Sequence, residues 1–81
     1  MIKRWYLYVL RCSDRSLYTG ITIDIKRRIK EHNSKEGCAY TRTRTPVKLV
    51  HKEIFKNRSE AAKREAEIKS LSRIEKIKLI K

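Results

Sequence analysis

The chain contains few glycines, prolines and cysteines, the residues that long linkers, disulfide frameworks and paired-cysteine zinc sites require. It holds only 2 glycines, 1 proline and 2 cysteines in 81 residues, with no repeat or low-complexity segment. A chain of this length buries one core and not two, so residues 1–81 are predicted to form one domain. Cys12 and Cys38 are isolated from each other, which matches neither a disulfide framework nor paired zinc ligands. We interpret them as packing residues in a reducing cytoplasm.

Long apolar runs are absent as well. No segment approaches the roughly 20 apolar residues that cross a bilayer. The first residues lead into an alternating pattern and not into the apolar core of a signal sequence. We therefore expect a cytoplasmic protein that has no membrane partner.

Acidic residues are scarce. There are 9 against 22 basic residues, which leaves a net charge of +13. A field of this sign on a small body favours polyanions, so nucleic acid is the expected partner. A solvated basic surface kept for solubility and a ribosome-associated role are the alternatives. Apolar residues still make up 40% of the chain, which is enough for a folded core, and we expect a monomer.

The N-terminal third predicts a β-hairpin. Residues from about 4 to 11 are aromatic and β-branched, a polar loop of about four residues follows, and a second strand leads to Gly20. We expect Gly20 to end that strand, where the chain bends sharply or approaches a ligand closely. The first strand is predicted to be central because both of its faces are apolar, with Tyr6, Tyr8 and Leu10 on one and Trp5, Leu7 and Val9 on the other.

A helix is predicted next, capped by Thr22 or Asp24. Ile25, Ile29 and His32 share one stripe of it, and Arg28 lies one turn before His32 on the same side. The helix is expected to end near residues 33–37. Residues 37–46 are interpreted as a basic loop without periodicity. A third strand is predicted to follow Pro46, at about residues 47–55.

Two helices are predicted to close the chain, which gives an α+β fold in the order β-β-α-β-α-α. Asn57 and Glu60 resemble a capping box, and Ser72 and Glu75 form a full one, so helices should begin near residues 58 and 73. Each helix is expected to bury one apolar stripe, formed by Ala61, Ala62, Ile68 and Leu71 in the first and by Ile74, Ile77 and Ile80 in the second.

One acidic residue stands out because it falls on an inward stripe. Glu65 lies between Ala61 and Ile68 at helical spacing, whereas the other charges of that helix, including Arg64, can mostly point outward. A carboxylate there needs a cation or a hydrogen-bond donor. An internal salt bridge to an arginine is one interpretation. The other is Mg²⁺ or Mn²⁺ held by one carboxylate, phosphate oxygens and waters.

Tyrosine, arginine and histidine are brought together by neighbouring elements. Tyr8 and Tyr18 lie on adjacent strands, and the helix that carries Arg28 and His32 follows directly. Tyrosines on a sheet are usually core or rim residues. Nearby positive charge, however, can lower the pKa of a phenol from about 10 by about 1 to 3 units, so we expect one to act as a base. Arg28 and His32 could then bind the scissile phosphate, which completes the groups needed to cut a phosphodiester bond.

These motifs resemble those of the GIY-YIG nucleases, in particular the small stand-alone bacterial branch of that family. Tyr6-Leu7-Tyr8 and Tyr18-Thr19-Gly20 are similar to its two name-giving motifs, and Arg28, His32 and Glu65 match its helical arginine, its histidine and its metal-binding glutamate. The first motif has Tyr6-Leu7 where the name has Gly-Ile. No asparagine follows Asn57, so the late amide that some members use has no counterpart.

The resemblance implies a three-stranded antiparallel sheet flanked by about three helices, and Mg²⁺-dependent hydrolysis of DNA. By this resemblance Tyr8 is the base, or the partner of the base, for the attacking water, and Tyr18 supports the water or the phosphate. Arg28 stabilises the transition state, a role worth about 3 to 4 kcal/mol for one donor. His32 assists leaving-group departure or phosphate binding. Glu65 anchors Mg²⁺ or Mn²⁺.

Larger members of the family carry a separate DNA-binding domain, and 81 residues leave no room for one. We therefore expect DNA targeting to come from the chain's own basic surface or from a protein partner. The segment around Tyr40, Arg42 and Arg44 interleaves hydroxyls and guanidiniums beside an aromatic ring, and with Arg27 it is the expected nucleic-acid contact. A disordered, solvated loop is the alternative. Function is thus expected to be DNA cleavage in repair or processing. A weak or inactive basic nucleic-acid-binding module is the competing hypothesis, and an interaction-only protein comes third.

Overall fold

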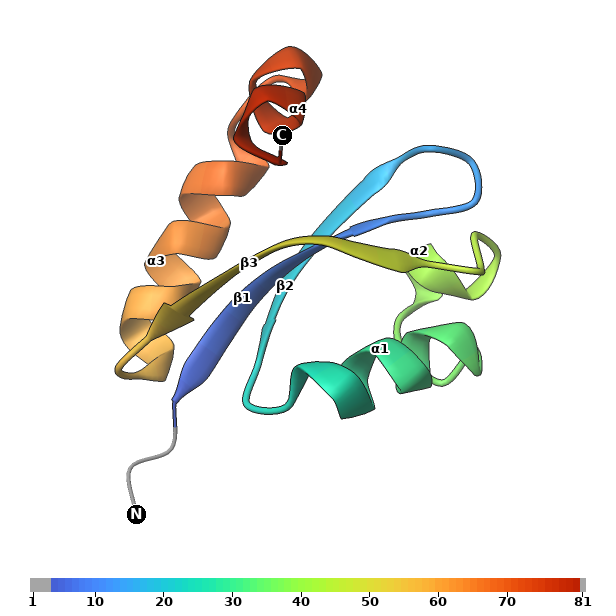
Figure 1. Ribbon diagram of the computed structural model, residues 1–81, viewed down its shortest axis with the longest axis horizontal. Helices are drawn as coiled ribbons and strands as arrows, with labels where there is room; N and C mark the ends of the chain where they lie inside the picture. Colours follow the sequence, from blue (N-terminus) through green and yellow to red (C-terminus); the bar gives the residue numbers. More distant parts are fainter. Residues whose placement is uncertain (1–3, 81) are drawn as a thin grey trace.

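The computed structural model describes residues 4–80, and its α+β fold agrees with the sequence prediction. Strands β1 (Trp5–Arg11), β2 (Leu17–Thr22) and β3 (Lys48–Phe55) form an antiparallel sheet in the order β2-β1-β3, so the first strand is central as predicted. Figure 1 shows α1 (Ile25–Asn33) on one side of this sheet and α3 (Arg58–Lys69) on the other. The remaining helices are α2 (Ala39–Arg42) and α4 (Arg73–Ile80).

The two faces of β1 build two separate cores. Tyr8 and Leu10 pack with Cys12 and Val47 on the face that α1 covers. Leu7 and Val9 pack with Ile68 of α3 on the opposite face, and Leu79 and Ile80 of α4 pack against that cluster. This division follows from the alternation of side chains along a strand, and it fixes which residues of β1 can take part in chemistry beside α1.

Helix boundaries follow the predicted caps. Asp24 accepts a hydrogen bond from the backbone N–H of Arg27 at 3.1 Å, and Asn57 accepts one from Glu60 at 2.9 Å. The Ser72–Glu75 box is reciprocal, with distances of 2.9 and 3.2 Å. Each cap satisfies N–H groups that the first turn leaves without a helical partner, which explains why the helices α1, α3 and α4 begin where the sequence predicts.

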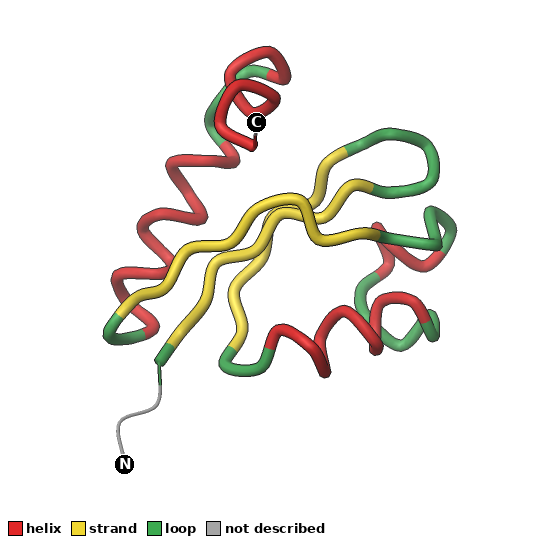
Figure 2. The backbone as a smooth tube through the Cα atoms, in the orientation of Figure 1, coloured by secondary structure: helices red, strands yellow, loops and turns green. Residues whose placement is uncertain are grey.

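The interpretation of residues 37–46 as a loop throughout is wrong. This segment contains the short helix α2, and its turn is closed by bonds from Arg42 N to the Cys38 carbonyl and from Arg44 N to the Thr41 carbonyl, at 3.1 and 3.0 Å. Figure 2 shows this helix beside the end of α1. One helical turn has too few residues for periodicity to be visible in the sequence.

Two further expectations are corrected. Gly20 does not end β2. It pairs with Tyr8 inside the sheet, and the strand continues to Thr22. In α4, Ile74 is 69% exposed and therefore does not belong to the predicted buried stripe, and no residue of this helix is fully buried. The helix packs against the core with Leu79 and Ile80, of which only Ile80 was predicted.

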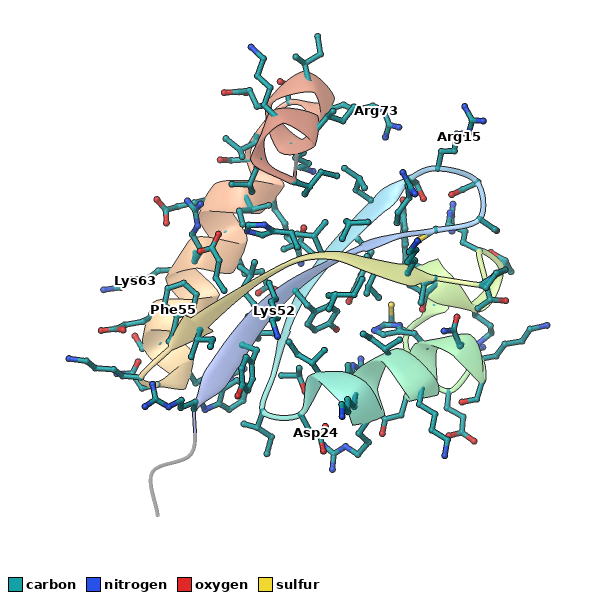
Figure 3. The ribbon with its side chains drawn as sticks, viewed as in Figure 1. Arg15, Asp24, Lys52, Phe55, Lys63 and Arg73 are labelled. Carbon is teal, nitrogen blue, oxygen red and sulfur yellow. The ribbon has the colours of Figure 1, made fainter. Side chains whose placement is uncertain are left out.

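The first residue of α4 contacts the loop of the hairpin. Arg73 donates a hydrogen bond to the carbonyl of Arg15 at 2.9 Å, and Figure 3 shows these two residues at the same end of the molecule. In residues 4–80, no helix is long and apolar enough to cross a membrane.

Candidate active site

Four of the five predicted site residues meet between the sheet and α1. The phenol oxygen of Tyr8 lies 3.1 Å from Nε2 of His32, and Nε of Arg28 lies 3.4 Å from the same phenol oxygen. The ring of Tyr18 stands 5.4 Å from that of His32 and 6.4 Å from that of Tyr8, measured between centroids. One β-hairpin and the following helix thus supply two phenols, an imidazole and a guanidinium.

Gly20 allows this arrangement. A Cβ atom at this position would lie 2.5 Å from the phenol oxygen of Tyr8 and 2.6 Å from its Cζ. The sequence predicted that the chain bends sharply or approaches a ligand closely at Gly20, and here the backbone of Gly20 closely approaches the side chain of Tyr8. A larger residue would push the phenol away from its place beside His32.

Hydrogen-bonding capacity indicates the direction of the Tyr8–His32 bond. A guanidinium can only donate, so the Tyr8 oxygen accepts from Arg28. The phenol then has one hydrogen to donate, and Nε2 of His32 is the acceptor within reach. Tyr8 and His32 are 1% and 0% exposed, and a buried donor left unpaired would be unfavourable. The phenol is thus hydrogen-bonded to a possible proton acceptor.

Burial keeps both groups neutral. It raises the pKa of Tyr8 and outweighs the hydrogen bond and positive charge of Arg28, while the charge of Glu65 adds a smaller contribution in the same direction. Burial also raises the pKa of Tyr18, helped by its bond to Cys38. The expectation of a lowered phenol pKa is therefore wrong, because desolvation is the largest effect. Burial, followed by the charge of Arg28, lowers the pKa of His32.

The half-buried Glu65 occupies a different position from the other four. Its carboxylate lies 3.4 Å from Nζ of Lys69, one turn further along α3, and among residues 4–80 no hydrogen bond or ion pair joins it to the other four side chains. The alternative of a salt bridge to an arginine is thus replaced by one to a lysine. Arg64, expected to point outward, instead donates to both carboxylate oxygens of Glu53 at 2.9 and 3.2 Å.

A divalent metal would have few protein ligands here. The described part of the chain contains no group of three or more histidine, cysteine, aspartate or glutamate side chains that could hold an ion. Glu65 is one carboxylate with 25% of its side chain exposed, and its partner Lys69 is 53% exposed. This donor set fits Mg²⁺ that keeps several waters and takes phosphate oxygens, and it does not fit a cage of protein carboxylates.

The predicted nucleic-acid residues lie beside the cluster. Tyr40 stacks on Tyr18 at 5.7 Å between centroids, and the guanidinium of Arg44 lies 4.1 Å from the Tyr40 ring. Arg44 also binds Asp14 of the hairpin loop at 2.9 Å, so the segment is ordered and not a solvated loop. Arg42 is exposed and makes no ion pair within residues 4–80. Arg27 has 60% of its side chain exposed and lies 3.8 Å from Glu31.

Sequence reasoning missed two residues of the site. Thr41 is fully buried, and its hydroxyl lies 2.6 Å from Nδ1 of His32. Its hydroxyl is one of those in the segment around Tyr40, Arg42 and Arg44, which was expected to contact nucleic acid. Gly37 lies so close to His32 that a Cβ atom would overlap the imidazole. No local pattern marks either residue, because both contacts depend on how α2 packs against α1.

The fold and this cluster together define a class of protein. Residues 4–78 match the family model of the GIY-YIG catalytic domain. The chain therefore belongs to the GIY-YIG superfamily, whose members are endonucleases.

Within that superfamily its relatives are small UPF0213 proteins. One from Haloquadratum walsbyi is 58% identical over 74 residues, which cover 91% of this chain and 83% of the relative. One from Staphylococcus saprophyticus is 53% identical over 79 residues, which cover 98% and 96%. The solution NMR structure of the UPF0213 protein of Bacillus halodurans is 47% identical, has a TM-score of 0.62, and covers 95% of this chain and 82% of its own.

Proposed function

We propose that this protein is a Mg²⁺-dependent endonuclease that hydrolyses DNA phosphodiester bonds. The observation that carries the proposal is the bond from Tyr8 to His32, held beside Arg28 on a GIY-YIG domain. The net charge of the chain, +13, favours a polyanionic substrate. DNA repair or processing, in the cytoplasm and as one monomeric domain, is the setting that we propose for this activity.

Tyr8 and His32 act as a proton relay in this proposal. A phenol with a raised pKa is a poor base by itself. When Tyr8 accepts a proton from the attacking water, it passes its own hydrogen to Nε2 of His32, so no free phenolate forms. His32 is fully buried and its Nε2 is bonded to Tyr8, so in this proposal it acts on the substrate through Tyr8. Its burial therefore argues against the leaving-group role that the resemblance implied.

Arg28 both covers Tyr8 and binds phosphate in this account. Its side chain is 29% exposed and is held by Glu31 at 3.1 Å and by the Tyr8 oxygen at 3.4 Å. A scissile phosphate competes with Glu31 for the guanidinium, because both are anionic oxygen acceptors. Movement of Arg28 toward the phosphate uncovers the phenol for the attacking water. Tyr18, half-buried beside His32, supports the water or the phosphate.

Glu65 is the proposed anchor for the metal. Bound Mg²⁺ or Mn²⁺ would supply Lewis-acid stabilisation of the charge on a phosphoryl oxygen. The carboxylate must leave Lys69 to bind a cation, and a surface pair of this kind stabilises by only about 0–1 kcal/mol. Exchange of one partner for the other is therefore energetically accessible.

DNA contacts beyond the cleaved bond are assigned to the α2 segment. Arg42 is exposed beside the Tyr18–Tyr40 stack, and Arg27 lies on the neighbouring helix. We propose that these guanidiniums contact phosphates, while Arg44 holds the Tyr40 ring in place from its bond to Asp14. A separate protein partner could add targeting.

A binding module without turnover is the second candidate. The observation that favours it is that Glu31 binds Arg28 and Lys69 binds Glu65. The group proposed to bind phosphate and the group proposed to bind metal therefore already have partners. Such a module would bind DNA in a salt-sensitive manner that does not depend on metal.

A nicking assay on supercoiled plasmid distinguishes the two candidates. The endonuclease nicks in Mg²⁺ or Mn²⁺ but not in EDTA, and Glu65→Gln removes nicking while its thermal midpoint stays near that of the wild type. Glu67→Gln is the matched control, because Glu67 lies on the same helix with 65% of its side chain exposed. Equal DNA affinity with and without metal, and no cleavage of duplex, branched or single-stranded substrates, would establish the binding module instead.

A further inference from the structure

Thr41 contacts the side of His32 that faces away from Tyr8. Its hydroxyl oxygen lies 2.6 Å from Nδ1 of the imidazole and 3.3 Å from the carbonyl oxygen of Cys38. The side chain is 0% exposed, so these contacts are made without competition from bulk water. A buried hydroxyl therefore bonds a buried imidazole directly beneath the candidate active site.

The carbonyl decides how this hydroxyl is used. A carbonyl oxygen can only accept, so Thr41 donates its one hydrogen to Cys38. The lone pairs of the hydroxyl then accept from Nδ1, which must carry a hydrogen. The remaining polar neighbour of the hydroxyl, Sγ of Cys38 at 3.7 Å, is a weak hydrogen-bonding group that does not change this assignment.

Both ends of the network require the same tautomer of His32. From Thr41, the hydrogen sits on Nδ1 and the lone pair is on Nε2. From Arg28, which can only donate to the Tyr8 oxygen, the phenol hydrogen is left for Nε2. The two assignments start from groups on opposite sides of the imidazole and agree.

Gly37 lets the segment containing Thr41 come this close. A Cβ atom on Gly37 would overlap Nδ1 and lie 2.9 Å from Cγ of His32. The chain passes over the ring at Gly37, and α2 then places Thr41 three residues after Cys38, where its hydroxyl reaches back to the Cys38 carbonyl. The hydrogen bond to His32 is therefore a consequence of the Gly37–Arg42 backbone path.

We infer that Thr41 is a positioning residue that selects the tautomer of His32 able to receive a proton from Tyr8. Its importance for turnover rests on the proposed function, whereas the tautomer is a property of the folded chain. Without the hydroxyl, a hydrogen on Nδ1 would be buried without this acceptor. A hydrogen on Nε2 would instead point at the Tyr8 oxygen and block the relay.

NMR of the protein labelled with ¹⁵N-histidine tests the inference without reference to activity. The chain has 2 histidines, and His51→Gln identifies the signals of His32. At a pH where His32 is neutral, the wild type is expected to show a protonated Nδ1 and an unprotonated Nε2. Thr41→Val is expected to shift the tautomer ratio toward Nε2–H by about tenfold, the effect of losing one ordinary hydrogen bond, and Thr41→Ser to restore it.

Two results overturn the inference. One is a wild-type His32 with its hydrogen on Nε2, which decides the matter even if Thr41→Val does not fold. The other is a folded Thr41→Val variant with the wild-type tautomer ratio.

The nicking assay separates this inference from the proposed function. Thr41→Val is expected to nick about tenfold more slowly, Thr41→Ser to recover the rate, and Ser59→Ala, which removes an exposed hydroxyl from α3, to match the wild type as a control. A tautomer change in a protein that cleaves no DNA contradicts the endonuclease and leaves the role of Thr41 in place. Wild-type nicking by Thr41→Val contradicts the positioning role and leaves the endonuclease in place.

Discussion

The phenol oxygen of Tyr8 and Nε2 of His32 lie 3.1 Å apart, although the two residues are 24 positions apart in the chain. Tyr8 lies on a strand and His32 on a helix. Neither group is a strong acid or base in its ordinary form. Because the two are buried together, the phenol stays protonated and the imidazole stays neutral, which is the state in which a proton can pass from one to the other. This pair links the fold to the proposed chemistry.

Gly20→Ala tests whether the position of the Tyr8 ring matters. The added Cβ would lie 2.5 Å from the phenol oxygen, so the ring must move away from His32. We expect a folded protein that is less stable by about 1–3 kcal/mol, as for other overpacked cores, and that nicks DNA at least about tenfold more slowly. Thermal unfolding and plasmid nicking measure the two effects, and wild-type nicking by this variant would show that the Tyr8 position is unimportant.

Glu31→Gln tests the competition for Arg28. Removing the carboxylate frees a guanidinium that is now held at 3.1 Å, so we expect tighter DNA binding and a lower KM. Glu36→Gln changes the net charge equally at an exposed position and serves as the control. Fluorescence anisotropy with a labelled duplex gives both affinities, and equal tightening in the two variants would leave only the general effect of charge.

The pH dependence of nicking reports on His32. The relay needs a neutral imidazole, and a pKa below the ordinary 6.5 means that protonation occurs only at lower pH. We therefore expect the rate to stay level from neutral pH to about 6.5 and to fall below it. A rate that already falls between pH 8 and 7 would be inconsistent with a buried imidazole as the acceptor.

The same lowered pKa has a consequence for stability. The unfolded chain binds the proton first, so His32 contributes stability that is fully present above about pH 6.5 and is lost as the pH falls through the folded-state pKa. The thermal midpoint of the wild type should therefore decline as the pH falls from about 6.5 through the folded-state pKa of His32. This decline should be smaller in His32→Gln. This measurement does not depend on catalysis.

Much of the fold could be predicted because its signals are local. Apolar residues on both faces of β1 indicated that it is central, and the Asn57 and Ser72 caps placed the starts of α3 and α4. The packing of α4 through Leu79 and not Ile74 could not be predicted, because an exposed and a buried isoleucine look the same in a short helix.

The sequence identified four side chains that the structure brings together, but it did not indicate the energetics of the cluster. Tyr8, Tyr18, Arg28 and His32 were identified from motif order, and the structure brings them together. The direction of the phenol pKa shift was wrong because sequence shows the nearby arginine and does not show the burial that outweighs it. Thr41 was missed for a related reason, since its contact with His32 exists only in the packed structure.

Plasmid nicking by Tyr8→Phe tests whether the Tyr8 hydroxyl takes part in cleavage. The substitution removes only the hydroxyl that bonds His32 and Arg28 and keeps the buried ring, so the fold and DNA binding should be retained. We expect metal-dependent nicking by the wild type and a loss of about 10²- to 10⁴-fold in the variant at unchanged DNA affinity. Equal nicking by the two proteins in the same metal, or no nicking by the wild type on any DNA, would contradict this expectation.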